Sequence, residues 1–257
     1  MFRYFFNALL VTVVVDAWGQ NQSPDTATVR RPKRIDTVSY VPTGLRIGTD
    51  VIALIRSRDN SFKGWEMTFD LDLARYYITV EYGYWNTQQS LDNFQLLASV
   101  ANPVLRTSGN YNNEGYYFRF GTDVNFLLKD PEKNMFFLGL RYGISNFNEN
   151  VNYVNQPSFP GFAPFSQGLS NGSVSGSWLE VTAGMRIRVY KALWMGYTAR
   201  LKFAPSTNGA ASFDSYDMPG YGIISETPNW GFNYQLFWRF DWNKLMRGKK
   251  KRSTFSK

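Results

Sequence analysis

WGFNYQLFWRFDW, the segment Trp230–Trp242, alternates between apolar and polar side chains along most of its length. Its even-numbered positions hold Trp, Phe, Tyr, Leu, Trp, Phe and Trp, whereas most odd-numbered positions hold Gly, Asn, Gln, Arg or Asp. A period of two is typical of a β-strand with one apolar and one polar face. The segment is also long enough to cross a bilayer as a tilted strand, which takes roughly 9–11 residues.

Seven further segments alternate in the same way, so we expect eight antiparallel strands. In each of them apolar side chains dominate one parity, and glycine, threonine, asparagine or charged side chains dominate the other. These segments are Gly44–Arg56, Gly64–Asp72, Arg75–Trp85, Tyr116–Leu127, Met135–Phe147, Trp178–Val189 and Leu193–Phe203.

The connections between the segments alternate in length. Every second one is short, namely Leu73–Ala74, Leu128–Asn134 and Tyr190–Ala192. Ser57–Lys63 is as short as Leu128–Asn134 and does not discriminate. Short periplasmic turns and long external loops are typical of outer-membrane barrels. The pattern predicts three long external loops, at Asn86–Gly115, Asn148–Ser177 and Ala204–Asn229.

The number of apolar side chains and the positions of the strand glycines indicate which face of the sheet meets water. Roughly forty side chains share the apolar parity, and the interior of an eight-stranded barrel is only just wide enough to be filled by side chains. Glycine relieves crowding on a concave sheet face. We therefore predict an all-β, eight-stranded antiparallel up-and-down transmembrane β-barrel with a polar, side-chain-filled interior. The alternative is a soluble exported barrel with the apolar parity inside. The strand glycines on the polar parity are Gly48, Gly83, Gly121, Gly139, Gly143, Gly184, Gly196 and Gly231.

Charged side chains are frequent on the predicted inner face, with both signs equally represented. Because an unpaired buried charge is very costly, we expect them to pair as a structural network that fills the lumen. The alternative is a proton or ion path. The residues are Arg46, Arg119, Arg141, Arg186, Arg188, Arg200, Lys202 and Arg239 with Asp50, Glu66, Asp70, Asp72, Glu81, Asp123, Glu180 and Asp241.

The two ends of the chain differ in composition from the strand-rich body. We expect a signal peptide at 1–19, a basic periplasmic linker at 20–42, the barrel at 43–242 and a basic periplasmic tail at 243–257. An even strand count places both termini on the short-turn side, in the periplasm. In the tail, Lys249, Lys250, Lys251 and Arg252 are candidates for binding anionic lipid head groups or an acidic partner, although charge runs are usually solvated.

Composition argues against several functions. The chain contains no Cys and no His, which removes a thiol nucleophile and the commonest general base and metal ligand. We find no nucleotide-binding loop, nucleophile elbow or metal-ligand spacing. The net charge of +8 resides mainly in the terminal segments, so a nucleic-acid-binding face on the barrel is not expected. We expect neither an enzyme, nor a metal site, nor a cofactor.

Several stretches resemble an uncharacterised family of small outer-membrane β-barrel proteins from the Bacteroidetes phylum. They are PTGLRIGTD at Pro42–Asp50, ARYYITVEYGY at Ala74–Tyr84, GLRYG at Gly139–Gly143, WLEV at Trp178–Val181 and WMGY at Trp194–Tyr197. The resemblance covers about Val41–Trp242. It implies a fold and a membrane, with no catalytic residue to carry over.

These observations favour a non-enzymatic outer-membrane barrel of a Gram-negative bacterium with a structural or accessory role, such as a subunit of an envelope export or assembly complex. Its expected partners are outer-membrane lipid and other envelope proteins. One alternative is a surface adhesin or ligand-binding barrel that uses its long loops, among which PSFPGFAPF at Pro157–Phe165 is apolar. A narrow channel is the third hypothesis. A small-molecule ligand cannot be named from the sequence.

Overall fold

The computed structural model describes residues 42–92, 105–127, 130–157, 161 and 163–242. The chain divides into two units, Met1–Thr37 and Val38–Lys257, and the first lies wholly outside the described residues. The predicted signal peptide, nearly all of the basic linker, and the tail with its four basic candidates, Lys249, Lys250, Lys251 and Arg252, also lie outside them. The barrel belongs to the second unit.

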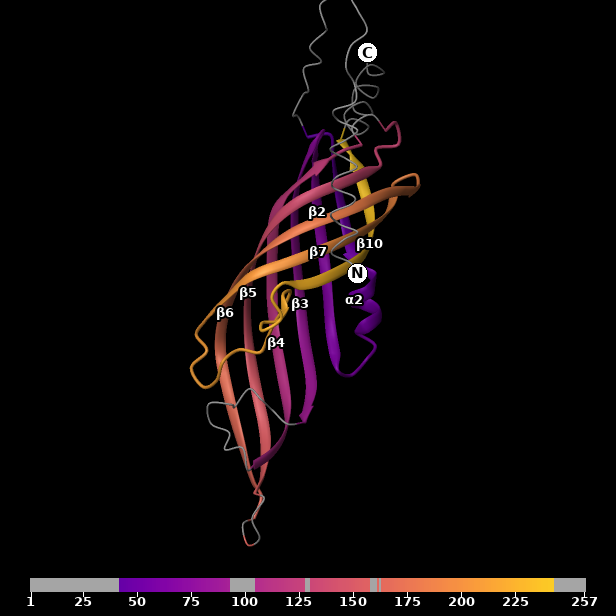
Figure 1. Cartoon of the computed structure of the whole chain (residues 1–257). Coiled ribbons are helices and arrows are strands. Elements are labelled where there is room, and N and C mark those ends of the chain that lie inside the picture. The colour runs from indigo at the N-terminus through magenta and orange to yellow at the C-terminus, as the bar shows by residue number, and fades with distance from the viewer. Residues whose placement is uncertain (1–41, 93–104, 128–129, 158–160, 162, 243–257) are drawn as a thin grey trace, which may run out of the picture. The chain divides into compact units, whose positions relative to one another are not determined.

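Eight strands close into an antiparallel barrel in the order β1-β10-β7-β6-β5-β4-β3-β2, and the pairing of β1 with β10 completes the ring. This confirms the predicted up-and-down fold (Figure 1). A short hairpin of β8 and β9 lies in the connection between β7 and β10. The strands are β1 Gly44–Asp50, β2 Phe62–Leu73, β3 Tyr76–Asp92, β4 Leu105–Asn125, β5 Met135–Pro157, β6 Phe165–Tyr190, β7 Leu193–Asn208, β8 Asp217–Met218, β9 Gly222–Ile223 and β10 Asn229–Asp241.

A helix, α2 (Val51–Arg56), replaces the second half of the first predicted strand. The prediction of a strand over Gly44–Arg56 is wrong beyond Asp50, where β1 ends. Val51–Ile55 is apolar at every position, and a short apolar run without alternation does not distinguish a strand from a helix. Asp50 starts the helix as its N-cap, because Asp50 Oδ1 accepts a hydrogen bond from the Ile52 N–H at 3.0 Å.

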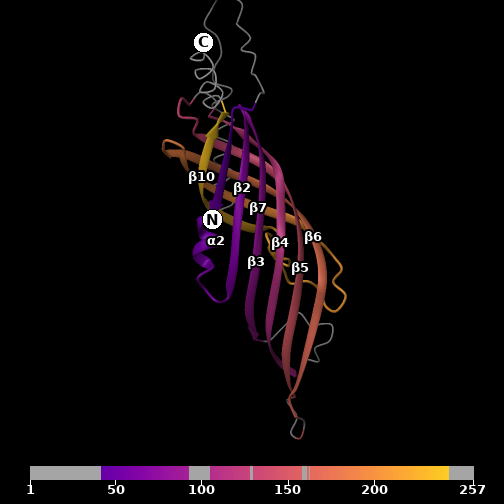
Figure 2. The same cartoon turned by 180° about the vertical axis from the view of Figure 1, so that it is seen from behind.

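β4, β5 and β6 extend well beyond the ends of the other strands, as both views show (Figures 1 and 2). The prediction of loops throughout Asn86–Gly115 and Asn148–Ser177 is therefore wrong for much of both segments, which continue the strands. The reason is that the alternation changes sense in this extension, so the apolar parity of the strand no longer continues.

The side chains of β5 show this reversal of polarity most clearly. Up to Ile144, outward positions are apolar and exposed, while inward positions are mostly glycine or polar. Beyond it the outward side chains are mostly polar and the inward ones largely apolar. β3 and β4 change at a matching level, because the paired Tyr84 and Tyr116 are followed outward by Asn86 and Glu114. On β5 the exposed outward residues are Asn146, Asn148, Asn150 and Asn152, and the buried inward ones include Phe147, Val151 and Tyr153.

Between the short turns and the level of this reversal, the outer surface of the barrel is apolar. Leu140 is 64% exposed and Trp238 53% exposed, and a contiguous surface of this kind on a folded chain indicates contact with lipid or another apolar partner. Aromatic contacts between Trp65, Tyr82 and Tyr116 follow the edge of this apolar band that is nearest the strand extension. Within the described part of the chain, no helix has the length and apolarity needed to cross a membrane.

Large rings fill the space above the glycines on the inner face. Gly143 is paired with Trp178, and a Cβ atom at Gly143 would overlap the Trp178 ring. Gly83 is paired with Tyr117 in the same way. Cross-strand pairs of an aromatic ring over a glycine stabilise curved sheets. The glycines therefore face inward, as predicted. They also leave room for inward-facing aromatic rings, which the alternation does not reveal.

Replacing Gly143 by valine should prevent the barrel from closing. The added side chain would occupy the position of the Trp178 ring, which is fully buried and has no free space to enter. We expect the compact, heat-modifiable band on a gel of the refolded protein to disappear. Gly172→Val is the matched control on β6, because nothing lies within 4 Å of a Cβ there. A Gly143→Val barrel as stable as the parent would contradict this packing.

Candidate functional site

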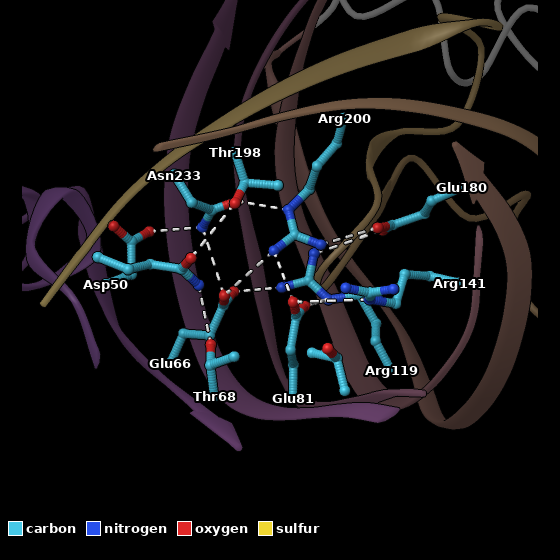
Figure 3. A network of polar contacts seen from close by, with 12 residues as sticks. Asp50, Glu66, Thr68, Glu81, Arg119, Arg141, Glu180, Thr198, Arg200 and Asn233 are labelled. Atoms are coloured by element: carbon cyan, nitrogen blue, oxygen red, sulfur yellow. Dashed lines mark hydrogen bonds and ion pairs between the residues drawn. The ribbon is translucent and has the colours of Figure 1, made fainter. Parts of the chain in front are cut away.

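Ten buried charged side chains form one continuous ion-pair network across the barrel interior, and Figure 3 shows the part of it around Arg119 and Arg200. Five are arginines and five are acids, so the network is neutral as a whole. They come from every strand of the barrel except β10, which places the network across the full width of the lumen. The members are Arg46, Arg119, Arg141, Arg186 and Arg200 with Glu66, Asp70, Glu81, Asp123 and Glu180.

Two arginines hold the outer part of the network together. Arg119 Nε lies 2.9 Å from Glu81 Oε2, its Nη1 lies 3.3 Å from Glu180 Oε1, and its Nη2 contacts Glu66. Arg200 contacts the same three acids, with its Nη2 2.8 Å from Glu81 Oε1 and its Nη1 3.0 Å from Glu180 Oε2. Each guanidinium therefore bridges several strands, and every carboxylate is shared (Figure 3).

The inner part of the network adds aromatic contacts to the ion pairs. Arg141 Nη1 lies 2.7 Å from Asp123 Oδ1, and Arg186 contacts both Asp70 and Asp123. The Arg186 guanidinium lies 4.9 Å from the ring centres of Phe137 and Phe237. In the same way, Arg46 lies over Tyr77 at 4.5 Å and over Trp194 at 5.2 Å. Such cation–π contacts are strongest where the cation is desolvated.

Six of the sixteen predicted lumen residues lie outside this network, namely Arg188, Lys202, Arg239, Asp50, Asp72 and Asp241. Arg239 pairs with Asp72 and Asp241 at the barrel end that carries Thr43. Asp50 has no Lys or Arg partner among the described residues, and it accepts a hydrogen bond from Asn233 Nδ2 at 2.7 Å instead. Arg188, which the alternation places inside, is exposed at the end of β6, where its Nε donates to the Lys191 carbonyl. That part of the prediction is wrong because β6 ends just beyond Arg188, at Tyr190, so the side chain reaches solvent although Arg188 still pairs with Trp194.

The network separates two cavities that share no lining residue. One of about 410 Å³ lies at the turn end, with Thr43, Asp72 and Lys133 in its wall. The other, the outer cavity, measures about 450 Å³ and has Glu66, Arg119 and Arg200 in its wall. The buried side chains of the network occupy the lumen between the two cavities.

The connection between β7 and β10 folds back into the outer mouth of the barrel. Met218 and Tyr221 are fully buried there against Tyr117 and Trp178. The sequence predicts an external loop over Ala204–Asn229 and does not predict this docking. Its apolar residues among prolines and glycines, MPGYG at Met218–Gly222, are the only signal that could have suggested it. Pro157–Phe165, the apolar loop segment that the adhesin alternative would use, lies partly outside the described residues.

Asp217 is the acid that this docked connection brings into the barrel. It is 5% exposed and lines the outer cavity, and its Oδ1 has no hydrogen-bond partner. Burial raises the pKa of the Asp217 carboxyl to about 6, partly offset by the charge of Lys202. Lys202 Nζ instead donates to the carbonyl oxygens of Gly220, at 3.3 Å, and of Tyr221. The carboxyl also interacts with the Met218 N–H, so Oδ1 is the part of this buried group that is left unsatisfied.

Within the described residues, no group of three or more acidic, His or Cys side chains could hold a metal ion. The network acids are each paired with arginine, which leaves them suited to a structural role rather than to proton transfer.

Nearly the whole chain matches one protein family. Residues 1–241 match the family described as "Domain of unknown function (DUF6048)". The chain belongs to the DUF6048 family. No curated protein sequence matches it.

Several solved structures are similar in part. They include CarO of Acinetobacter baumannii (9% identity, 79% of this chain and 99% of that one, TM-score 0.32), CarO2 of the same species (9%, 79% and 99%, TM-score 0.36) and the attachment invasion locus protein Ail of Yersinia pestis (10%, 77% and 97%, TM-score 0.28). With TM-scores this low, the similarities carry no information about activity.

Removing one arginine of the network should destabilise the DUF6048 barrel strongly. Arg119→Ala leaves Glu66, Glu81 and Glu180 short of a shared cation, and an uncompensated buried charge costs about 3–5 kcal/mol. We expect the urea midpoint of unfolding in detergent to fall accordingly. Arg188→Ala, an exposed arginine on β6, is the control and should change little. Equal midpoints for the two variants would show that the network contributes no net stability.

Docking of the β7–β10 connection should depend on pH. Because the docked carboxyl of Asp217 has a pKa of about 6, above its ordinary value of 3.8, the docked form binds the proton more tightly. Docking should therefore weaken as pH rises from about 4 to 6, by roughly 3 kcal/mol in all, and be constant above that range. Limited proteolysis of the connection across this range measures it. Asp217→Asn should abolish the pH dependence, and an unchanged profile in that variant would assign the effect to another group.

Proposed function

We propose that this DUF6048 protein is a sealed, non-enzymatic outer-membrane barrel with a structural or accessory role in the envelope of a Gram-negative bacterium. The neutral ten-residue ion-pair network is the observation that carries the proposal, because it leaves no open passage between the two cavities. An enzyme would need a reactive group in reach of substrate, whereas the network acids are held in ion pairs.

The outer surface supports the membrane location. The apolar band ends at Tyr84, Tyr116 and Ile144, and the polar side chains beyond it fit an aqueous phase. The three-strand extension would then project outside the cell, with the short turns in the periplasm. Thr43 and Trp242 lie together at the turn end, joined by a hydrogen bond from Trp242 N–H to the Thr43 carbonyl. On this proposal both basic terminal segments are periplasmic. The stretches of sequence quoted above favour a Bacteroidetes source.

Two roles fit a sealed barrel. As an accessory subunit, the protein would offer its apolar outer band and its periplasmic tail, with Lys249–Arg252, to other envelope proteins. As a receptor, it would bind a ligand at its outer mouth, and the outer cavity of about 450 Å³ is the observation that favours this second role. A channel is the least favoured role because the lumen is filled.

The proposal is tested by conductance and by co-purification. Reconstituted in planar bilayers, the barrel should give no steady single-channel steps, while its heat-modifiable band shows that it has folded and inserted. Regular conductance steps would overturn the sealed barrel. Gentle detergent extraction followed by mass spectrometry should recover stoichiometric envelope partners, and these should be lost from a chain that ends at Trp242 if the tail binds them. A lone monomer would overturn the accessory role and leave the receptor role.

A further inference from the structure

The barrel wall is incomplete in its outer half. β1 stops at Asp50, opposite Gln235, so Asn229–Tyr234 of β10 pair with β7 alone. On the other side, Phe62–Glu66 of β2 pair with β3 alone. α2 stands in the gap between these two edges, beside the outer half of β2 (Figures 1 and 2).

The helix is tied to one edge of the gap. The Gly64 N–H donates to Ser57 Oγ at 2.7 Å, and Ser57 in turn donates to the Gly64 carbonyl. Thr49 Oγ1 donates to the Glu66 carbonyl at 2.9 Å. These bonds satisfy the β2 edge with side chains in place of a neighbouring strand.

The opposite edge is not tied in this way. Asp50 Oδ1 accepts from the Tyr234 N–H at 3.3 Å, so the Tyr234 backbone faces the gap. With a period of two, the backbone groups of Phe232 and Trp230 face it as well. Among the described residues, no hydrogen bond joins α2 to Asn229–Phe232. The helix packs against both strands, but it is hydrogen-bonded only along the β2 side; the side toward Asn229–Phe232, which has no such bonds, is called the open seam.

The open seam lies within the apolar band. Phe232 is opposite Ala199 and Trp230 is opposite Leu201, both on the membrane side of Phe203. Its rims are apolar and exposed, with Ile55 on α2 at 59% and Trp230 on β10 at 63%. Exposed apolar rims at this level would contact the hydrocarbon of the outer leaflet.

Behind the seam lies the outer cavity. Both rims contribute to its wall, through Ile52 and Ala53 of α2 and Phe232 of β10. Aromatic rings dominate its apolar lining, and the buried Asp217 carries a carboxylate oxygen, Oδ1, without a hydrogen-bond partner there. A carboxylate among aromatic rings is the combination that recognises an ammonium group.

The other charges of the cavity have partners. Lys202 donates to two carbonyl groups, and Arg119 and Arg200 belong to the network together with Glu66. Arg56 lies 4.3 Å from the centre of the Phe62 ring, and Asp50 accepts hydrogen bonds from Asn233 and two backbone N–H groups. Glu226 is exposed to solvent. Asp217 interacts with Lys202 and with the Met218 N–H, and its Oδ1 is the carboxylate oxygen that remains free to accept a hydrogen bond from a ligand.

We propose that the seam between α2 and β10 is a lateral port through which the ammonium head of a single-chain, lipid-like amphiphile enters the outer cavity and binds Asp217. The acyl chain would remain in the membrane alongside Trp230 and Phe232. This inference rests on the proposed membrane location and specifies the ligand class of the receptor role.

Native mass spectrometry of the full barrel in detergent tests the proposal with two matched lipids. Lysophosphatidylethanolamine carries the ammonium group, whereas lysophosphatidylglycerol of the same chain length lacks it. We expect the first to bind at least about tenfold more tightly, because a charge-assisted bond in a desolvated site is worth that much or more. Equal binding of the two lipids would overturn the ammonium site.

Variants separate the site from the fold. Asp217→Asn should remove the preference for the ammonium lipid while the loop stays docked, and Asp59→Asn, an exposed acid in the turn after α2, should retain it. Gly231→Leu should block binding by filling the cavity, since a Cβ there meets only the flexible Lys202 and Arg200 side chains. Retained preference in Asp217→Asn would overturn the assignment.

Free ethanolamine tests the port itself. Lacking an acyl chain, it should not displace the lysolipid at concentrations at which the lysolipid saturates the protein. Full displacement would overturn lateral entry and indicate access from the aqueous mouth. Conductance of the same preparation reports separately on the sealed barrel, so failure of this inference is distinguishable from failure of the proposed function.

Discussion

Charge neutrality in a confined space is the constraint on which the rest of this structure depends. An eight-stranded barrel encloses only enough room for side chains, and any charge placed there must find its counterion within the same few ångströms. The five arginines and five acids meet this requirement by sharing, because Arg119 and Arg200 each contact the same three glutamates. The shared contacts link strands that are distant in sequence, and they fix the relative height of those strands.

The sequence predicts much of this framework, for physical reasons that can be named. Period-two alternation locates all eight strands of the barrel, and the glycines on the polar parity identify its inner face. The charged residues of that parity are gathered inside, with Arg188 as the exception. What alternation cannot supply is the partner of each charge, since that depends on the stagger between strands. Ion-pair partners such as Arg186 and Asp70 are far apart in the chain.

The features that escape prediction are those in which alternation stops or changes sense. Val51–Ile55 has no polar position and becomes a helix once Asp50 caps it. The strand extensions alternate with the opposite sense, so they read as polar loops. Docking of Met218 and Tyr221 into the mouth is a tertiary event with no local period. The outer cavity, and with it Asp217, depends on that docking and is invisible in the sequence.

The reversal of polarity at Ile144 means that one continuous sheet obeys two opposite rules of substitution. On the side of the short turns, an outward leucine is compatible with its surroundings and an outward asparagine is not. In the extension, an outward leucine in place of asparagine would expose an apolar surface to water. The extension is built like an ordinary water-soluble protein, with rings such as Tyr111 and Tyr153 in its core and asparagines on its surface. Relatives of this chain should therefore drift differently on either side of one ring of residues, and that ring would mark the membrane surface in an alignment without any structure.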